Sequence, residues 1–279
     1  EGEGVIVQSP VYFPFFSAVT TNNRKLVNNP LREINGRYEI DFEHLEECAQ
    51  QGAKLLLLCT PHNPVGRVWS EAELQQVLEI TRRYDLTILS DDIHCDLIYS
   101  AVKHTMLGCL AQPGDKIITT IAPNKSFNIP GLGLSALVIP NVAERNAMKH
   151  MFESLHVGNY NPLSITAFEA AYREGDQWLD TLMRYLEDTR NFAVDFIARE
   201  IPQIKLIKPE ATYLLWLDCR GLGMSDTQLR DFFVRECKVG MNPGTVFGKG
   251  GSGFMRMNIG TTKARIVAAL NAIKQHFPV

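Results

Sequence analysis

Short apolar runs alternate with amphipathic segments through the first half of the chain. The amphipathic segments, residues 41–51 and 70–84, carry apolar side chains at helical spacing, and Ser70 begins the second one with the Ser-x-x-Glu pattern of a capping box. The apolar runs are predicted strands at residues 5–7, 54–59, 86–89, 117–121 and 134–139. Strands that alternate with helices predict an α/β fold, in which a mainly parallel sheet has helices on both faces.

The second half of the chain has a different pattern. Residues 163–199 are mostly helical, with a break near Gly175 and Asp176. After them we predict, in order, a strand, a helix, a strand and a closing helix at residues 213–218, 227–237, 255–259 and 263–276. We therefore expect a large domain over residues 1–179 and a smaller α+β domain over residues 180–279.

Composition and charge exclude several classes of partner. The net charge of the 279 residues is −3, which gives no electrostatic basis for binding nucleic acid or a membrane surface. No apolar run approaches the roughly 20 residues of a membrane helix, and the first residues do not resemble a signal peptide. The six cysteines form no Cys-x-x-Cys pair, so we expect reduced thiols and a cytoplasmic location.

Three polar side chains follow predicted strands. Asn63, Asp91 and Lys125 each lie at or just past the end of such a strand. Ligands bind outside the carboxyl ends of strands in sheets of this type, so we expect the three to share one site. A lysine that can react with an aldehyde, a carboxylate for a ring nitrogen and an amide for a ring hydroxyl suit pyridoxal 5'-phosphate (PLP).

Each of these residues also has a simpler interpretation. Lys125 would ordinarily be a solvated surface charge, and Asn63 lies in an Asn-Pro-x-Gly run that is typical of turns. Asp91 and Asp92 are adjacent, so on a strand they point to opposite faces and only one can enter the site. For the other aspartate, a helix N-cap or a solvated turn is the expected role.

Three further residues are candidates for the same site. Arg256 lies inside an apolar strand and needs an anionic partner, either a substrate α-carboxylate or a buried structural ion pair. Tyr12 can stack on a planar cofactor, although a core aromatic is the alternative. His94 has no second ligand at metal spacing, so we expect no metal site. It lies close enough to Asp91 to adjust that carboxylate or an oxygen of the cofactor.

Together these residues resemble the fold-type I PLP-dependent enzymes of the class I/II aminotransferase superfamily. Within it, the chain is most similar to the cystathionine β-lyases of the MalY/PatB type, which are carbon–sulfur (C–S) lyases. The resemblance covers nearly the whole chain and rests on residues 9–12, 61–66, 90–94, 125–132, 211–218 and 256–260.

The resemblance implies a role for each site residue. Lys125 would bind the cofactor covalently and act as the proton shuttle. Asp91 would pair with the pyridinium nitrogen, Asn63 would donate to the ring oxygen, and Tyr12 would stack on the ring. Arg256 would hold the substrate carboxylate.

Other positions mark the branch of the superfamily and the departures from its pattern. His94 stands where ordinary aminotransferases carry tyrosine, which indicates the lyase branch. Asn124 stands where the family usually has a serine that touches the cofactor phosphate, and Asp92 stands where glutamate is common. The N-terminal part of the family pattern, which supplies a phosphate-binding helix N-terminus and a tyrosine across a homodimer, is absent. We therefore expect PLP to bind weakly to residues 1–279 alone.

The implied activity is an α,β-elimination. L-Cystathionine or a related cysteine S-conjugate would yield a thiol, pyruvate and ammonia. An aminotransferase acting on an L-amino acid is the alternative enzyme, and a non-catalytic regulatory or binding protein that keeps the fold is the alternative of another class.

Overall fold

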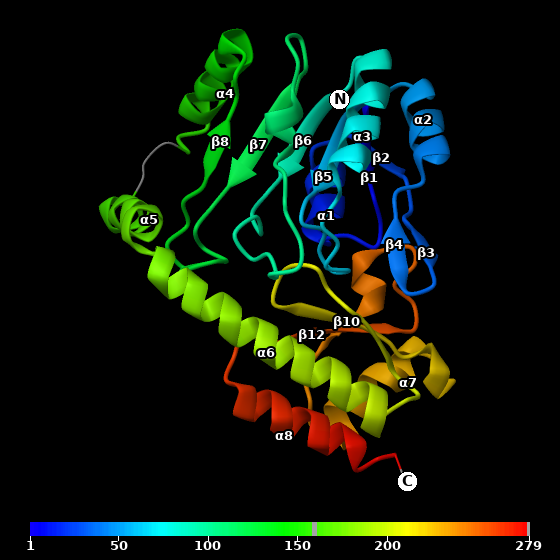
Figure 1. Ribbon diagram of the computed structural model, residues 1–279. Coiled ribbons are helices and arrows are strands. Elements are labelled where there is room, and N and C mark those ends of the chain that lie inside the picture. Colours follow the sequence, from blue (N-terminus) through cyan, green and yellow to red (C-terminus); the bar gives the residue numbers. More distant parts are fainter. Residues whose placement is uncertain (158–160, 278–279) are drawn as a thin grey trace.

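The computed structural model describes residues 1–157 and 161–277, and its larger sheet has six strands (Figure 1). Their order across the sheet is β2-β1-β5-β6-β7-β8. Neighbouring strands are parallel except for β8, which is antiparallel to β7. The strands are β1 (Gly4–Val7), β2 (Lys25–Asn28), β5 (Ala53–Cys59), β6 (Thr87–Asp91), β7 (Ile117–Ile121) and β8 (Ala136–Val138). The predicted mainly parallel sheet is confirmed.

Strand β8 differs from its prediction in length and in the way it joins the sheet. Residues 134–139 were expected to form a strand, but only Ala136–Val138 do so, antiparallel to β7. A parallel return needs a crossover connection, usually a helix. Residues 122–135 form turns instead, and these turns carry Lys125. The chain therefore comes back beside β7 in the opposite direction.

Helices cover both faces of the larger sheet. Helices α2 (Phe42–Gln50) and α3 (Glu71–Arg83) pack on the face that carries Ile6, Leu56 and Leu58. Helix α1 (Pro14–Thr21), which was not predicted, packs on the other face, against Val5, Val7 and Leu57. Side chains alternate between the faces along each strand, so one apolar run supplies both cores.

The predicted capping box begins helix α3. The Ser70 hydroxyl accepts a hydrogen bond from the Glu73 backbone N–H at 3.2 Å, and the Glu73 carboxylate accepts one from the Ser70 N–H at 2.7 Å. These two bonds satisfy donors that a helix end otherwise leaves unpaired.

Replacing Ser70 by alanine should lower the free energy of unfolding by about 1 kcal/mol, because one of these bonds is lost. Urea unfolding followed by circular dichroism measures the change. Ser17→Ala, at an exposed position inside α1, is the matched control and should unfold at nearly the wild-type urea concentration. Equal stability of Ser70→Ala and the wild type would show that the cap contributes nothing.

A second sheet forms the lower part of the molecule (Figure 1). It is antiparallel, with the order β11-β12-β10-β9. Its strands are β9 (Lys205–Ile207), β10 (Leu214–Asp218), β11 (Asn242–Pro243) and β12 (Phe254–Asn258). Helices α6 (Asp176–Glu200), α7 (Asp226–Asp231) and α8 (Lys263–Lys274) supply much of its apolar cover. This is the α+β content predicted for the second half.

The two sheets share part of their apolar packing. Trp216 of β10 and Phe254 of β12 stack at 5.1 Å and belong to the core of the larger sheet. The Trp216 indole also donates to the Tyr38 hydroxyl at 3.1 Å. The boundary between residues 179 and 180 falls inside α6, and the division into two domains stays a prediction.

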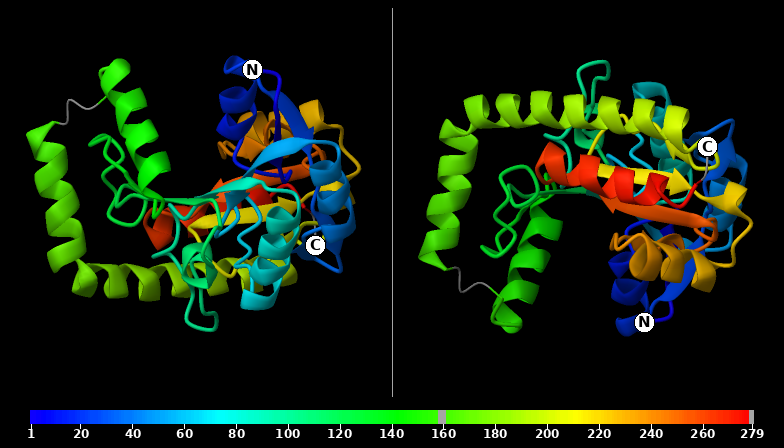
Figure 2. Two further views of the ribbon diagram at one scale, coloured as in Figure 1. Left: turned by 90° about the horizontal axis from the view of Figure 1, so that it is seen from above. Right: turned by 90° about the horizontal axis from the view of Figure 1, so that it is seen from below.

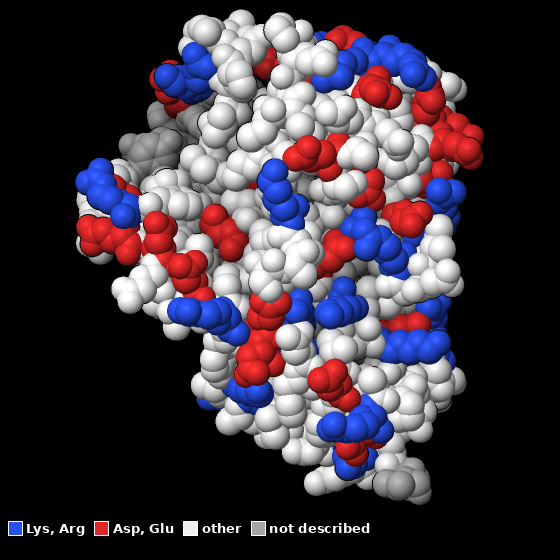
Figure 3. Space-filling model, viewed as in Figure 1, with Lys and Arg blue, Asp and Glu red and all other residues white. Residues whose placement is uncertain are grey.

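The remaining elements lie at the edges of these sheets. Strands β3 (Arg32–Ile34) and β4 (Arg37–Glu39) form a separate hairpin. Helices α4 (Val142–Ser154), α5 (Pro162–Glu174) and α6 follow one another around one side of the molecule (Figure 2). None of the helices within the described residues is long and apolar enough to cross a bilayer. On the face shown in Figure 3, acidic and basic side chains are interspersed.

Candidate active site

One pocket brings together every residue that the sequence predicted for the site. Its volume is about 280 Å³, and it lies where β5, β6 and β7 end, against β10 and β12 of the second sheet. The predicted residues that line it are Tyr12, Asn63, Asp91, His94, Asn124, Lys125 and Arg256.

Strand register sets the floor of this pocket. Cys59 at the end of β5 is paired with Asp91 at the end of β6, and Asp91 is paired with Thr120 of β7. The turn after β7 carries Lys125, which is half-buried. The next residue, Ser126, anchors this turn by donating to the Asp96 carboxylate at 2.8 Å. The ends of the neighbouring strands β5, β6 and β7 thus place polar side chains in the same pocket.

The two adjacent aspartates have separate surroundings. The Asp91 carboxylate lines the pocket and accepts a hydrogen bond from the Thr120 hydroxyl at 3.1 Å. Burial raises the pKa of Asp91 to about 6, and none of the described basic side chains forms a salt bridge with it. A half-buried carboxylate without a charged partner favours a cationic or N–H partner.

Asp92 does not have the role expected of it. We predicted a helix N-cap or a solvated turn, but the side chain is fully buried. Its carboxylate accepts from the Ser90 hydroxyl at 2.6 Å and lies 3.1 Å from His104 Nε2. The prediction was wrong because the segment that carries His104 covers the opposite face of β6, which a local pattern does not reveal.

Arg256 reaches from β12 to the loop after β5. Its Nη1 donates to Asn63 Oδ1 at 2.9 Å and its Nη2 to Asn242 Oδ1 at 2.8 Å. Burial lowers the pKa of Arg256. Within the described residues, neutral amides rather than a carboxylate contact the guanidinium, so no structural ion pair accounts for it. The positive charge remains available for an anionic ligand.

Three buried polar atoms in the pocket have no hydrogen-bond partner among the described residues. They are Nδ1 of His94, Oδ1 of Asn124 and Nε of Arg256. Burial, with the charges of Lys125 and Arg256 adding to it, lowers the pKa of His94 to about 3. The imidazole is therefore neutral at ordinary pH. Unpaired buried polar atoms are costly, so these three indicate a site built for a polar ligand.

Tyr12 and Tyr213 supply aromatic surface to the pocket. Tyr12 is half-buried and meets the Phe15 ring edge-on at 5.9 Å. Tyr213 was not among the predicted site residues, and it meets the His94 ring edge-on at 5.9 Å. Burial raises the pKa of the Tyr213 phenol.

The placement of Tyr213 depends on backbone strain at the residue before it. Thr212 has φ 71°, in the left-handed region that a β-branched residue rarely adopts. Its N–H donates to the Leu97 carbonyl at 2.8 Å, and its carbonyl accepts from the Tyr99 hydroxyl at 2.7 Å. A threonine just before a predicted strand gives no sign of this conformation, so the sequence did not indicate that Tyr213 faces the site.

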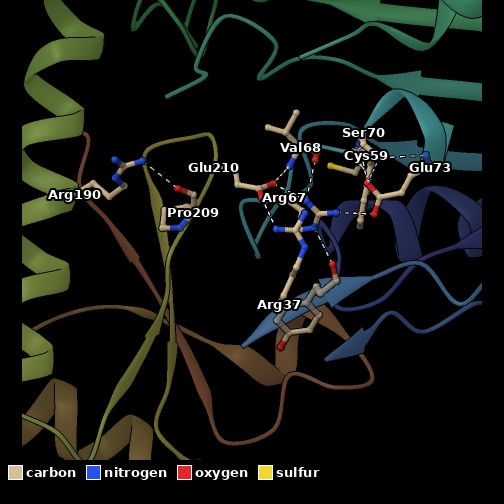
Figure 4. A network of polar contacts seen from close by, with 11 residues as sticks. Arg37, Cys59, Arg67, Val68, Ser70, Glu73, Arg190, Pro209 and Glu210 are labelled. Carbon is tan, nitrogen blue, oxygen red and sulfur yellow. Dashed lines mark hydrogen bonds and ion pairs between the residues drawn. The ribbon is translucent and has the colours of Figure 1, made fainter. Parts of the chain in front are cut away.

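A buried arginine supports the loop that leads from β5 to α3. Figure 4 shows Arg67 between the two carboxylates of Glu73 and Glu210, with both N–O distances at 2.6 Å. Arg67 also donates to the Tyr38 carbonyl at 2.8 Å, and only 4% of the residue is exposed. The network ties the loop to α3, the hairpin and the segment before β10.

Arg67→Ala should lower the free energy of unfolding by about 3 kcal/mol or more, because two partly buried carboxylates lose their partner. Arg37→Ala is the control within the same network. Its side chain is 54% exposed and 2.9 Å from Glu210, so it should cost less than about 1 kcal/mol. Urea unfolding of both variants measures the difference. Equal losses would show that burial does not strengthen the Arg67 contacts.

The donors and acceptors of the pocket fit PLP. The Asp91 carboxylate suits a ring N–H. The Asn63 carbonyl is occupied by Arg256, which leaves the amide N–H groups to face a ring oxygen. Lys125 supplies an amine for an aldehyde, and His94 and Asn124 supply unpaired polar atoms. The fit rests on these groups together, not on any single one.

Comparisons with known proteins agree with this site. The chain matches the family described as aminotransferase class I and II over residues 1–273. It is 42% identical to cystathionine β-lyase PatB of Bacillus subtilis and 32% identical to protein MalY of Escherichia coli, each over 98% of this chain and 71% of the relative.

A solved structure has the same fold. Cystalysin of Treponema denticola, which contains a PLP cofactor, superposes with a TM-score of 0.93 at 37% identity, over 98% of this chain and 70% of that one. The predicted resemblance is confirmed, and the chain belongs to the aminotransferase class I and II family.

Proposed function

We propose that this protein is a PLP-dependent C–S β-lyase, which eliminates a thiol from an L-cysteine S-conjugate such as L-cystathionine. The observation that carries the proposal is the convergence of Asn63, Asp91, Lys125 and Arg256 on one pocket. Similarity to lyases of this kind supports it.

Each residue of the pocket would act on one part of the chemistry. Bound PLP supplies an aldehyde for a covalent bond and a ring that accepts electrons from the substrate α-carbon. The Nζ of Lys125 would hold the aldehyde of the cofactor, and the same amine would take the proton from the substrate α-carbon. Asp91 would be held ionised by the ring N–H, and Asn63 would donate to the ring oxygen.

Substrate binding is assigned to Arg256. Its guanidinium is a planar fork that can take a carboxylate with two parallel hydrogen bonds. Because its present partners are neutral amides, a carboxylate can replace them without separating an ion pair. This contact would fix the α-carbon beside Lys125.

The overall reaction balances as an elimination followed by hydrolysis. The Cα–H and Cβ–S bonds break, and the sulfur leaves with the bonding electrons and takes up a proton. Water then replaces the nitrogen of the released unsaturated product, which gives pyruvate and ammonia. An aminotransferase in the same pocket would instead pass the amino group to a keto acid.

The test is pyruvate release from L-cystathionine by the PLP-loaded protein with no keto acid added. We expect one pyruvate and one free thiol for each substrate consumed, measured with lactate dehydrogenase and a thiol reagent. Turnover that requires an added keto acid and releases no thiol would identify an aminotransferase and refute the lyase.

A further inference from the structure

A second cavity, of about 550 Å³, also has Lys125 in its lining. We call it the leaving-group chamber. Asn124, Lys125, Tyr213 and Asn258 line both this chamber and the pocket described above. The two spaces therefore adjoin, and Lys125 belongs to the wall that they share.

One wall of the chamber comes from α6. Trp178, Leu182, Tyr185 and Leu186 of this helix line it. Trp178 is 47% exposed and Tyr185 41% exposed, which is unusual for large aromatic side chains. The Trp178 ring stacks on Phe127 at 5.6 Å, and the Tyr185 hydroxyl accepts from the Lys263 N–H. The aromatic wall is thus fixed in place.

Charge is scarce in the chamber. Apart from Lys125, its described lining residues carry no charged side chain. The remaining polar groups are hydroxyls and amides, and Asn258 Oδ1 already accepts from the Gly260 N–H at 2.7 Å. A charged group placed here would lose its hydration without gaining an ion-pair partner.

Strand β12 leads from the carboxylate site to the chamber. Arg256 and Asn258 are two residues apart on this strand, so their side chains point to the same face. A substrate held by its carboxylate on Arg256 can therefore extend along β12, past Asn258, into the chamber. The group on sulfur would occupy it.

We propose that the leaving-group chamber binds the sulfur substituent and selects uncharged, apolar substituents, above all aromatic ones. The zwitterionic end of L-cystathionine is disfavoured there, because the chamber offers no partner for its ammonium or its carboxylate. The proposal rests on the proposed lyase function and goes beyond it by naming the class of leaving group.

The first experiment compares kcat/KM for pyruvate release from S-benzyl-L-cysteine and from L-cystathionine, with the PLP-loaded protein. We expect the benzyl substrate to be preferred on the order of tenfold. Trp178→Ala should reduce that preference by a similar factor, and Trp178→Phe should retain most of it. Leu163→Ala is the control, since Leu163 is an exposed apolar residue of α5 outside the chamber lining.

A binding measurement gives a second readout. Trp69 and Trp216 are fully buried, so a change in tryptophan emission on adding phenylmethanethiol would report Trp178. We expect this change in the wild type and its loss in Trp178→Ala.

The outcomes separate the two proposals. Pyruvate from both substrates, with L-cystathionine preferred or with Trp178→Ala lowering both rates equally, would overturn the chamber assignment and leave the lyase intact. An emission change that persists in Trp178→Ala would also overturn it. If neither substrate yields pyruvate, the lyase proposal is refuted, and the proposed role of the leaving-group chamber is refuted with it.

Discussion

Replacing Lys125 by alanine is expected to lower kcat/KM for thiol elimination by at least about 10³-fold, because in the proposed mechanism one side chain supplies both the covalent bond and the proton transfer. The fold should be unaffected, since Lys125 is only half-buried and forms no hydrogen bond with the described residues. Pyruvate release measures the activity, and urea unfolding checks the stability.

Lys116→Ala is the control for this experiment. Lys116 precedes the same strand, β7, at its opposite end, and pairs with Asp85 at 2.6 Å. Its removal should leave turnover close to that of the wild type. Ordinary activity in Lys125→Ala would exclude Lys125 as the catalytic amine, whatever else lines the pocket.

Asp91→Asn should have opposite effects on activity and stability. Turnover should fall on the order of 10²–10³-fold, because the amide carries no charge to stabilise a protonated ring. Stability of the cofactor-free protein should rise at neutral pH. The folded state raises the pKa of Asp91 from 3.8 to about 6, so the stability this carboxyl contributes is complete below pH 4 and lost as the pH rises through 6.

The stability gain should therefore depend on pH. Asparagine cannot ionise, so the variant should gain up to about 3 kcal/mol over the wild type above pH 6 and less than about 1 kcal/mol near pH 4. Urea unfolding of the cofactor-free protein at pH 4 and pH 7.5 measures it. A gain of the same size at both values would show that ionisation of Asp91 is not the cause.

Asp92→Asn is the paired control for Asp91→Asn. It removes the charge from the buried contact with His104, so it should lower stability, while the activity of the folded fraction changes far less than in Asp91→Asn. Equal losses of activity in both variants would show that Asp91 is not the carboxylate that serves the cofactor.

The sequence predicted the parts of the site that local patterns determine. Periodicity identified β5, β6 and β7, and parallel pairing then placed Asn63, Asp91 and Lys125 at one edge. Arg256 was identified because an arginine in an apolar strand needs a partner, but its contact with Asn63 joins residues 193 positions apart, and no local pattern encodes it.

The misses have the same physical origin. The direction of β8 depended on turns replacing a crossover helix, and the burial of Asp92 depended on the segment that carries His104. The strained Thr212 is held by contacts with Leu97 and Tyr99. In each case tertiary packing overrode what neighbouring residues favour on their own.

The hydrogen bond from Arg256 to Asn63 makes the two ends of the site thermodynamically linked. A ligand that accepts a hydrogen bond from the Asn63 amide makes the Asn63 carbonyl a better acceptor for Arg256. A carboxylate that binds Arg256 Nη1 competes with this Arg256–Asn63 hydrogen bond and weakens it. Such linkage is reciprocal, so each ligand changes the binding free energy of the other by the same amount. A substrate without an α-carboxylate would therefore lose its contact with Arg256. It would also no longer change how strongly Asn63 binds the ring oxygen of the cofactor.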